Sequence, residues 1–267
     1  MEEINITDSF EVPSKTDWLY LESKNINDIR IDINKFNSYQ GRFLLYPRIN
    51  ELIKGFNNKI YLLSITYTLC HHYYDLGIPD EPWYISPSED GKKSVQYMPN
   101  FRSEHYMRHF WFSYFASNLY ITMFGIYDCL INLIANFYGI SSQNASSQRK
   151  DVVKYLKENF PQMLKLLDDF KENKIYKQAN EYRNRFVHGT APNEISQKYK
   201  DRNFIVNATF NDKKSILKEE NIYNSAITSC SIGEYTPVKN IIETFDKLTE
   251  QTVILKNQII EIMIDLK

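Results

Sequence analysis

Long stretches of this chain carry no helix-breaking residue. Among 267 residues there are only 8 Gly and 9 Pro, and residues 103–138 contain one glycine and no proline. Folds made of many short strands need frequent turns, which are commonly built with Gly and Pro, so this scarcity favours a few long helices. A content of 43% hydrophobic residues is enough for a substantial core. We therefore expect an all-α fold, an up-and-down helical bundle.

The spacing of apolar residues predicts where the helices lie. From about residue 38 to residue 74 they recur at intervals of three and four, which marks one helical face, and Pro47 starts or kinks this helix. Residues 77–100 gather Gly and Pro and form a connecting loop, anchored by Trp83 and Tyr84. Further helices are expected at 103–138, 149–158 and 161–188, and a last one begins at Thr236 and Pro237.

Two segments depart from the helical pattern. Residues 1–34 have no sustained period, so we expect an N-terminal leader packed on the core through Trp18 and Tyr20. The remaining residues, 35–267, form one helical domain with an insertion at 190–235. Within this insertion, residues 203–210 alternate as a strand does, and Asn211-Asp212 suits a turn into a strand at 215–217. A small accessory β-hairpin is therefore expected near 200–220.

Charge and cysteine content exclude several classes of protein. A net charge of −1 argues against coating nucleic acid through bulk electrostatics, so any RNA contact must be local. The three cysteines form no CxxC pair, and the neighbouring His71 and His72 point about 100° apart on a helix, which is poor geometry for one shared ion. No metal site and no cofactor are expected.

The chain has no evident export or membrane signal. Its N-terminus is acidic where a secretory signal would be basic. Residues 110–127 lack charged side chains, but Ser113, Ser117, Asn118 and Thr122 interrupt this stretch, which favours a buried core helix over a membrane span. We expect a cytoplasmic protein that does not enter a membrane.

One helix end combines residues suited to chemistry. On a helical wheel, Arg183 falls inside an apolar arc, where its permanent charge needs a partner, solvent or a site that uses it. Beside it, Asn180, Asn184 and His188 form a polar strip at four-residue spacing. Histidine is the side chain best suited to proton transfer near neutral pH, and Gly189 ends the helix.

The string Arg183-Asn184-Arg185-Phe186-Val187-His188 resembles the Rx4-6H motif of the HEPN superfamily. The resemblance extends to the helical layout of residues 38–188 and the last helix. It implies a HEPN-type bundle and a metal-independent endoribonuclease, with two Arg and two His meeting at one phosphate across a homodimer. His188 would transfer protons and Arg183 would stabilise the transition state, with Asn184 and Arg185 in support.

The same resemblance leaves the biological setting open. It suggests a toxin or defence protein that acts on RNA and is held by a protein inhibitor or antitoxin. In toxins of this family silenced through a tyrosine, that tyrosine lies two positions after the histidine, where this chain has Thr190. A further hypothesis is that Asp128, on an otherwise apolar helix, pairs with Arg183 from another helix; an exposed polar face is the alternative.

Two other functions are compatible with the sequence. A non-catalytic HEPN-like module would bind a nucleotide, RNA or a protein in the same cleft, and a purely structural helical dimer would do neither. RNA cleavage that survives EDTA separates the enzyme from both.

Overall fold

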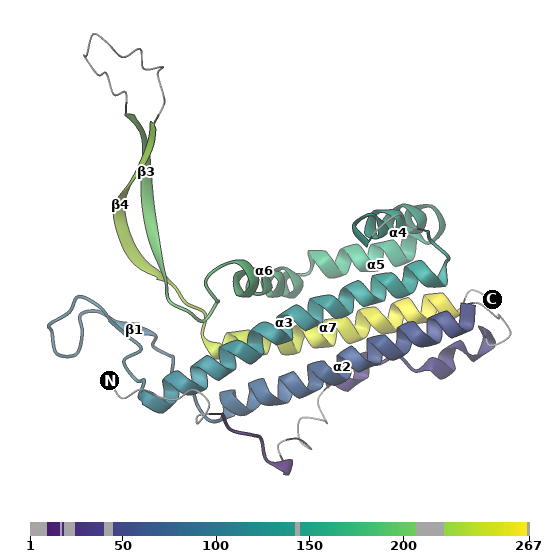
Figure 1. Cartoon of the computed structure of the whole chain (residues 1–267), viewed down its shortest axis with the longest axis horizontal. Coiled ribbons are helices and arrows are strands. Elements are labelled where there is room, and N and C mark those ends of the chain that lie inside the picture. The colour runs from purple at the N-terminus through teal and green to yellow at the C-terminus, as the bar shows by residue number, and fades with distance from the viewer. Residues whose placement is uncertain are drawn as a thin grey trace, which may run out of the picture.

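The computed structural model describes residues 10–16, 18, 25–39, 45–141, 145–206 and 222–265. Three long helices lie along its long axis (Figure 1), and three shorter helices form a layer beside them. The long helices are α2 (Leu45–Asp75), α3 (Ser103–Phe137) and α7 (Val238–Asp265), and the shorter ones are α4 (Ala145–Asn159), α5 (Pro161–Glu172) and α6 (Lys174–His188). The expected all-α helical bundle is confirmed.

The core forms where the apolar faces of the long helices meet. On α2 the predicted face is largely buried, and apolar residues form a second buried face along α7. Burying one large aliphatic or aromatic side chain contributes roughly 1.5–3 kcal/mol, so these faces hold the helices together. The buried positions of α2 include Ile49, Ile53, Phe56, Ile60 and Leu63, and those of α7 include Ile241, Phe245, Leu248, Leu255 and Ile259.

Helix α3 lies at the centre of the bundle. Its length would suit a membrane span, as would the mean hydropathy of 1.3 over its most apolar 18 residues. However, 56% of this stretch is buried inside the fold, and α3 packs against α2, α6 and α7. Tyr120 is completely buried on α3 and donates a hydrogen bond of 2.7 Å to the carbonyl oxygen of Ile241 on α7. More than half of this apolar stretch of α3 is thus buried by its own chain, as expected for a core helix.

The segment predicted as one helix at 161–188 is two helices. Asn173 separates α5 from α6, and its side chain accepts a 2.8 Å hydrogen bond from the backbone N–H of Ile175, which caps α6. No Gly or Pro stands at this break, so no helix-breaking residue in the sequence marked it. The break expected near Asn159 is confirmed, with Pro161 in the first turn of α5.

Part of the expected leader packs firmly on the bundle. Two short 3-10 helices, η2 (Asn25–Ile29) and η3 (Ile33–Tyr39), precede α2. Ile26, Ile29 and Ile31 are buried in the common core, and Trp18 is half-buried, whereas Tyr20 lies outside the described residues.

Two β-hairpins interrupt the helices. The loop after α2 contains a short pair, β1 (Tyr84–Ile85) and β2 (Gln96–Tyr97). A longer antiparallel pair, β3 (Ser196–Val206) and β4 (Ile222–Glu234), projects from the bundle (Figure 1). The accessory hairpin is therefore confirmed but starts earlier and ends later than expected. The predicted turn at Asn211-Asp212 and the strand at 215–217 lie outside the described residues.

A buried polar network fixes the base of this hairpin. Tyr235 donates a 2.7 Å hydrogen bond to Asp80, which also accepts one of 2.8 Å from the N–H of Val238 at the start of α7. His109 Nε2 lies 3.2 Å from the Tyr235 hydroxyl and 3.1 Å from Asn193 Nδ2. The network links four segments distant in sequence, so it sets where the hairpin leaves the bundle.

This network predicts a pH-dependent stability. Burial lowers the pKa of His109 below its usual 6.5. As pH falls below about 6.5, the unfolded chain takes up a proton that the folded chain resists, so the free energy of unfolding decreases. Burial raises the pKa of Asp80, which has the opposite effect at lower pH, because the folded state then binds its proton more readily than the unfolded state.

Urea unfolding at pH 7.5 and pH 5.5 measures this effect. We expect the wild type to lose stability between the two values and His109→Gln to lose less. An equal loss in both proteins would show that another group carries the pH dependence.

Candidate active site

Packing against α3 fixes the orientation of helix α6. Ala179 and Tyr182 are buried, and the Tyr182 ring lies 5.9 Å from the ring of Tyr120 on α3. The Phe186 ring lies 5.9 Å from the same tyrosine, and Gln178 donates a 2.8 Å hydrogen bond to the Tyr182 hydroxyl. These contacts use one face of α6 and determine which residues lie away from it.

Arg183 is half-buried beside this anchored face. Its Nη1 donates a 3.0 Å hydrogen bond to the side-chain oxygen of Asn184, which is a neutral group. Its Nε is buried, and none of the described residues offers this atom a hydrogen-bond acceptor or a carboxylate within 4 Å. Because an uncompensated guanidinium is costly to desolvate, Arg183 is well placed to receive an anion from outside the chain.

His188 occupies the last turn of α6 and is exposed to solvent. The helix ends at Gly189, whose N–H donates a 3.1 Å hydrogen bond to the carbonyl oxygen of Arg185. Gly189 adopts an extended conformation with φ −146°, so it ends the helix without the left-handed geometry common at this position. The imidazole is accessible and no hydrogen bond ties it to the described part of the chain.

Both candidate catalytic residues come from the same short helix. A separation of five residues places Arg183 and His188 roughly 7.5 Å apart along the axis and about 140° apart around it. Asn184 is exposed between them and touches Arg183. The expected catalytic pair is therefore presented by one rigid element, with the two side chains on different sides of it.

Arg185 has a structural role that the sequence did not reveal. Its guanidinium donates to three carbonyl oxygens of the loop after α6, those of Thr190 at 3.3 Å, Ala191 at 3.2 Å and Pro192 at 3.4 Å. Backbone carbonyls carry no sequence signal, which explains why the contact was missed. Arg185 thus fixes the connection between α6 and the long hairpin, and its N–H groups already donate to these carbonyl oxygens.

The expected pairing of Asp128 with Arg183 does not occur between these two described residues. Asp128 is exposed on α3, and no ion pair of 4 Å or less joins it to Arg183. Water satisfies an exposed carboxylate, so the physical reason to expect a partner is absent. The alternative, an exposed polar position, is the one observed.

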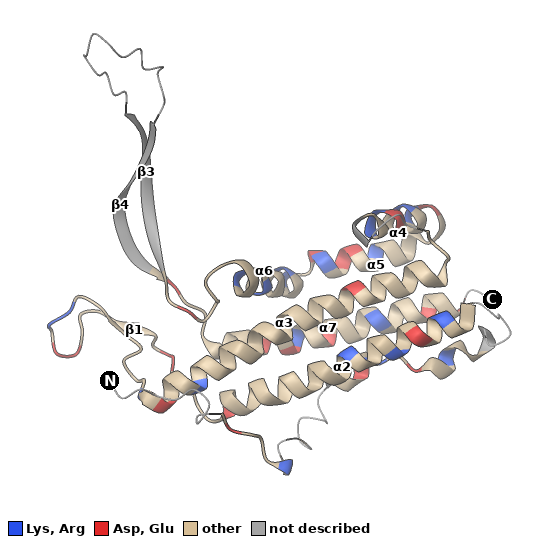
Figure 2. Ribbon diagram, in the orientation of Figure 1, with Lys and Arg blue, Asp and Glu red and all other residues tan. Residues whose placement is uncertain are grey.

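Two cations from α4 and α5 lie over the ring of Tyr127 on α3. Arg149 of α4 lies with its guanidinium carbon 5.5 Å from the centre of the Tyr127 ring, and Lys171 of α5 has its Nζ 5.9 Å from the same ring. The centre of the Tyr127 ring lies 6.1 Å from that of Tyr176 on α6, whose pKa is raised mainly by burial. Burial, followed by the charge of Arg149, lowers the pKa of Lys171. Figure 2 shows the Lys and Arg positions on these helices beside the mostly uncharged α3.

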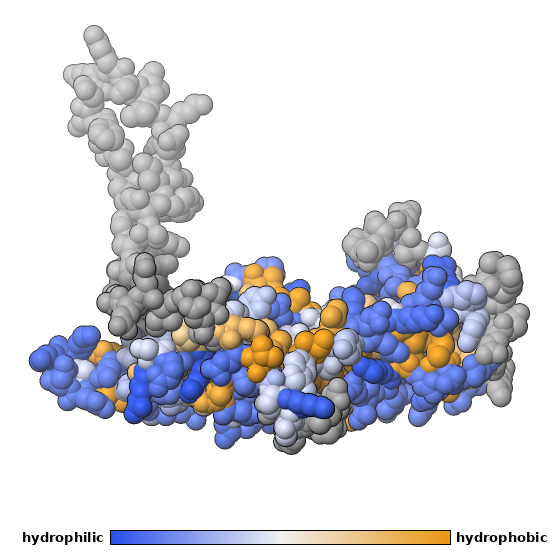
Figure 3. Space-filling model, turned by 60° about the horizontal axis from the view of Figure 1, so that its bottom comes forward, coloured by the Kyte–Doolittle hydropathy of each residue, from blue (hydrophilic) through white to orange (hydrophobic). Residues whose placement is uncertain are grey.

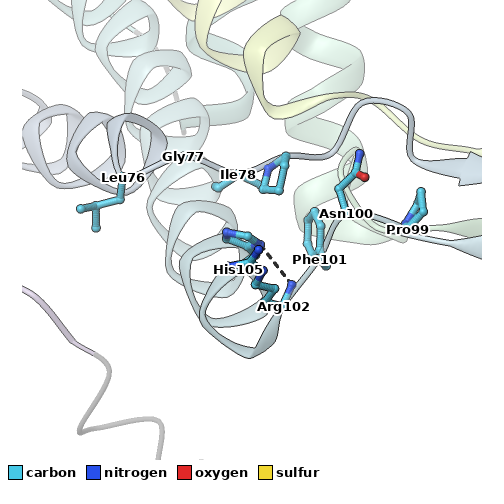
Figure 4. A pocket seen from close by; sticks show the side chains of 9 residues that line it. Leu76, Gly77, Ile78, Pro99, Asn100, Phe101, Arg102 and His105 are labelled. Atoms are coloured by element: carbon cyan, nitrogen blue, oxygen red, sulfur yellow. Dashed lines mark hydrogen bonds between the residues drawn. The ribbon is translucent and has the colours of Figure 1, made fainter.

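A separate depression lies where α2 ends and α3 begins (Figure 4). It has a volume of about 650 Å³, and its lining includes Phe101, Arg102 and His105. His105 Nδ1 accepts a 3.1 Å hydrogen bond from the backbone N–H of Arg102, which caps the start of α3. Neither Arg183 nor His188 lines it. Within the described ranges, no cluster of His, Cys, Asp and Glu side chains is suited to hold a metal ion.

Comparison with known proteins identifies the family. No curated protein and no solved structure matches the chain. The model of the Cthe2314-like HEPN family matches residues 52–253, which include α3, α6 and the Arg183-to-His188 motif. Because this match covers most of the chain, the protein belongs to the HEPN superfamily.

Proposed function

We propose that this HEPN protein is a metal-independent endoribonuclease in which Arg183 and His188 act on an RNA phosphodiester. The observation that supports this most directly is Arg183, whose buried Nε has no acceptor in the described chain, on the same helix as an exposed histidine. An unpaired guanidinium suits an oxygen of a phosphate, and an accessible imidazole suits proton transfer.

The chemistry follows from these two groups. His188 takes the proton from a ribose 2′-hydroxyl, whose oxygen attacks the adjacent phosphorus. The bond to the 5′-oxygen then breaks, and a protonated imidazole returns a proton to that leaving oxygen. Arg183 stabilises the additional negative charge on the phosphate oxygens as the transition state forms. The products are a 2′,3′-cyclic phosphate and a 5′-hydroxyl, and no metal ion enters the balance.

A homodimer supplies the second imidazole that this scheme uses. One His188 acts as base while its counterpart from the other copy acts as acid. Four exposed apolar residues on α3 are spaced by four, four and seven positions, so they share one side of the helix. Val187 on α6 is exposed as well. The α3 residues of this stripe are Tyr106, Phe110, Tyr114 and Ile121. Such a surface suits a second copy of the chain.

Arg149 and Lys171 extend the positive charge beyond the scissile phosphate. In a chain with a net charge of −1, a local group of cations from α4, α5 and α6 is the element able to hold an RNA backbone. The expected setting is cytoplasmic, as a toxin or defence effector restrained by a protein inhibitor, because free ribonuclease activity harms its host.

The test is an RNA cleavage assay on the purified full chain in excess EDTA. An RNA oligonucleotide should be cut and should leave a 2′,3′-cyclic phosphate, while DNA of the same sequence and fully 2′-O-methylated RNA should remain intact. If the protein bound RNA without cleaving it, it would be a non-catalytic binding module and not an enzyme. Activity that disappears with EDTA and returns with a divalent ion would contradict the mechanism.

A further inference from the structure

A buried lysine lies on α7, away from helix α6. The Lys256 residue is only 6% exposed, although its side chain carries an ammonium group. That group donates hydrogen bonds to the carbonyl oxygen of Arg30 at 3.2 Å and to the side-chain oxygen of Asn257 at 2.6 Å. Both acceptors are neutral, and no described carboxylate lies within 4 Å of Nζ. Buried charges are usually paired with a counter-ion in direct contact, and here neutral oxygens take that place.

Further charged groups surround the same place. A cavity of about 280 Å³ lies between α7 and the segment of η2 and η3, and Arg30, Lys35 and Lys256 all line it. The Arg30 guanidinium carbon also lies 6.0 Å from the centre of the Tyr61 ring. Burial and the charge of Lys35 lower the pKa of Lys256, while the charge of Asp28 acts in the opposite direction.

The walls of this cavity are held by the core. The segment of η2 and η3 is fixed by the buried side chains of Ile29 and Ile31. Asn57 of α2 also holds the backbone of Ile31 on both sides, accepting from its N–H at 2.9 Å and donating to its carbonyl oxygen at 2.9 Å. The three cations are therefore brought together by a preformed structure, which is what a binding site requires.

We propose that this cavity binds a small ligand through a phosphate group. Lys256 has a third N–H available, and Arg30 and Lys35 supply further donors to phosphate oxygens. The volume is near the lower end of small-molecule sites, roughly 300–1,000 Å³, and suits inorganic phosphate or a mononucleotide better than a polymer.

Two carboxylates make the cavity selective. Asp28 and Asp32 also line it, and Asp32 already accepts a 2.9 Å hydrogen bond from the N–H of Asn34. Their charge disfavours highly charged anions, whereas a nucleoside monophosphate offers ribose hydroxyls that donate to them. The site contains no residue of α6 and is independent of RNA cleavage.

Thermal unfolding of the full chain tests this site at constant ionic strength, with inorganic phosphate and adenosine monophosphate in separate titrations and chloride as reference. We expect Tm to rise by several degrees at ligand concentrations about 100-fold above Kd. If Tm rises with both ligands, the site recognises the phosphate group itself. If Tm rises with adenosine monophosphate alone, the site requires the monophosphate ester.

The decisive variant is Lys256→Met, which keeps the length of the side chain but removes the charge. It should abolish the response, while its Tm without ligand stays the same or rises. Lys239→Met, at an exposed position of the same helix, should respond as the wild type does. Should Lys256→Met fold poorly, Lys35→Gln at the exposed wall should weaken the response at least threefold. No response beyond chloride, or an equal response in the lysine variants of the cavity, would overturn the proposal.

Discussion

Replacing His188 with alanine is expected to reduce RNA cleavage by about 10²–10⁴-fold, the usual contribution of a positioned general acid or base. The residue is exposed and has no hydrogen bond with the described part of the chain, so its contribution to folding is small. Substitutions at such surface positions usually change stability by less than about 0.5 kcal/mol. Cleavage measured in single turnover, alongside thermal unfolding, separates chemistry from folding.

A matched pair of variants sharpens this test. His188→Gln keeps a polar side chain of similar reach but cannot exchange a proton near neutral pH, so it should be as inactive as the alanine variant. Lys177→Ala removes an exposed cation of α6 that pairs with Glu172 and should cleave RNA within about twofold of the wild type. Full activity in both histidine variants would remove His188 from the mechanism.

The sequence predicted where most of the helices lie, because apolar spacing and helix-breaking residues are local properties. Residues 103–138 correctly predicted α3 (Ser103–Phe137), and Pro161 correctly marked the start of α5. The break at Asn173 was missed because no Gly or Pro marks it, and the capping hydrogen bond to Ile175 shows where α6 begins. A break without a Gly or Pro has to be recognised from its capping residue.

Contacts between distant segments could not be predicted in the same way. Arg149, Lys171 and Tyr127 come from three helices, and nothing in their sequence neighbourhoods indicates that they meet. Sequence could not decide between a pairing of Asp128 with Arg183 and an exposed Asp128 for the same reason, since the rotation of α3 against α6 decides which side chains face each other. The motif pointed to both arginines of α6 as candidates. Only their contacts in the packed bundle show that Arg183 and Arg185 have different roles.

That separation leads to the second large effect expected, which concerns the two arginines. Arg183→Ala should lower cleavage by about 10²–10³-fold, the loss typical when one stabilising donor is removed from a transition state. Arg183→Lys should recover only part of this activity, because an ammonium keeps the charge but cannot place two parallel N–H groups on a phosphate. Folding should be unaffected or slightly stabilised, since the buried Nε has no described acceptor to lose.

Arg185→Ala should show the opposite pattern. It removes the donors to the carbonyl oxygens of Thr190, Ala191 and Pro192, which is expected to lower stability by about 1–3 kcal/mol. At a temperature where the variant remains folded, its cleavage rate should fall far less than that of Arg183→Ala. Equilibrium unfolding and single-turnover cleavage on both variants measure this contrast. If Arg183→Ala instead lost stability and kept its activity, the guanidinium would belong to the packing of α6, and the phosphate would have to be bound elsewhere.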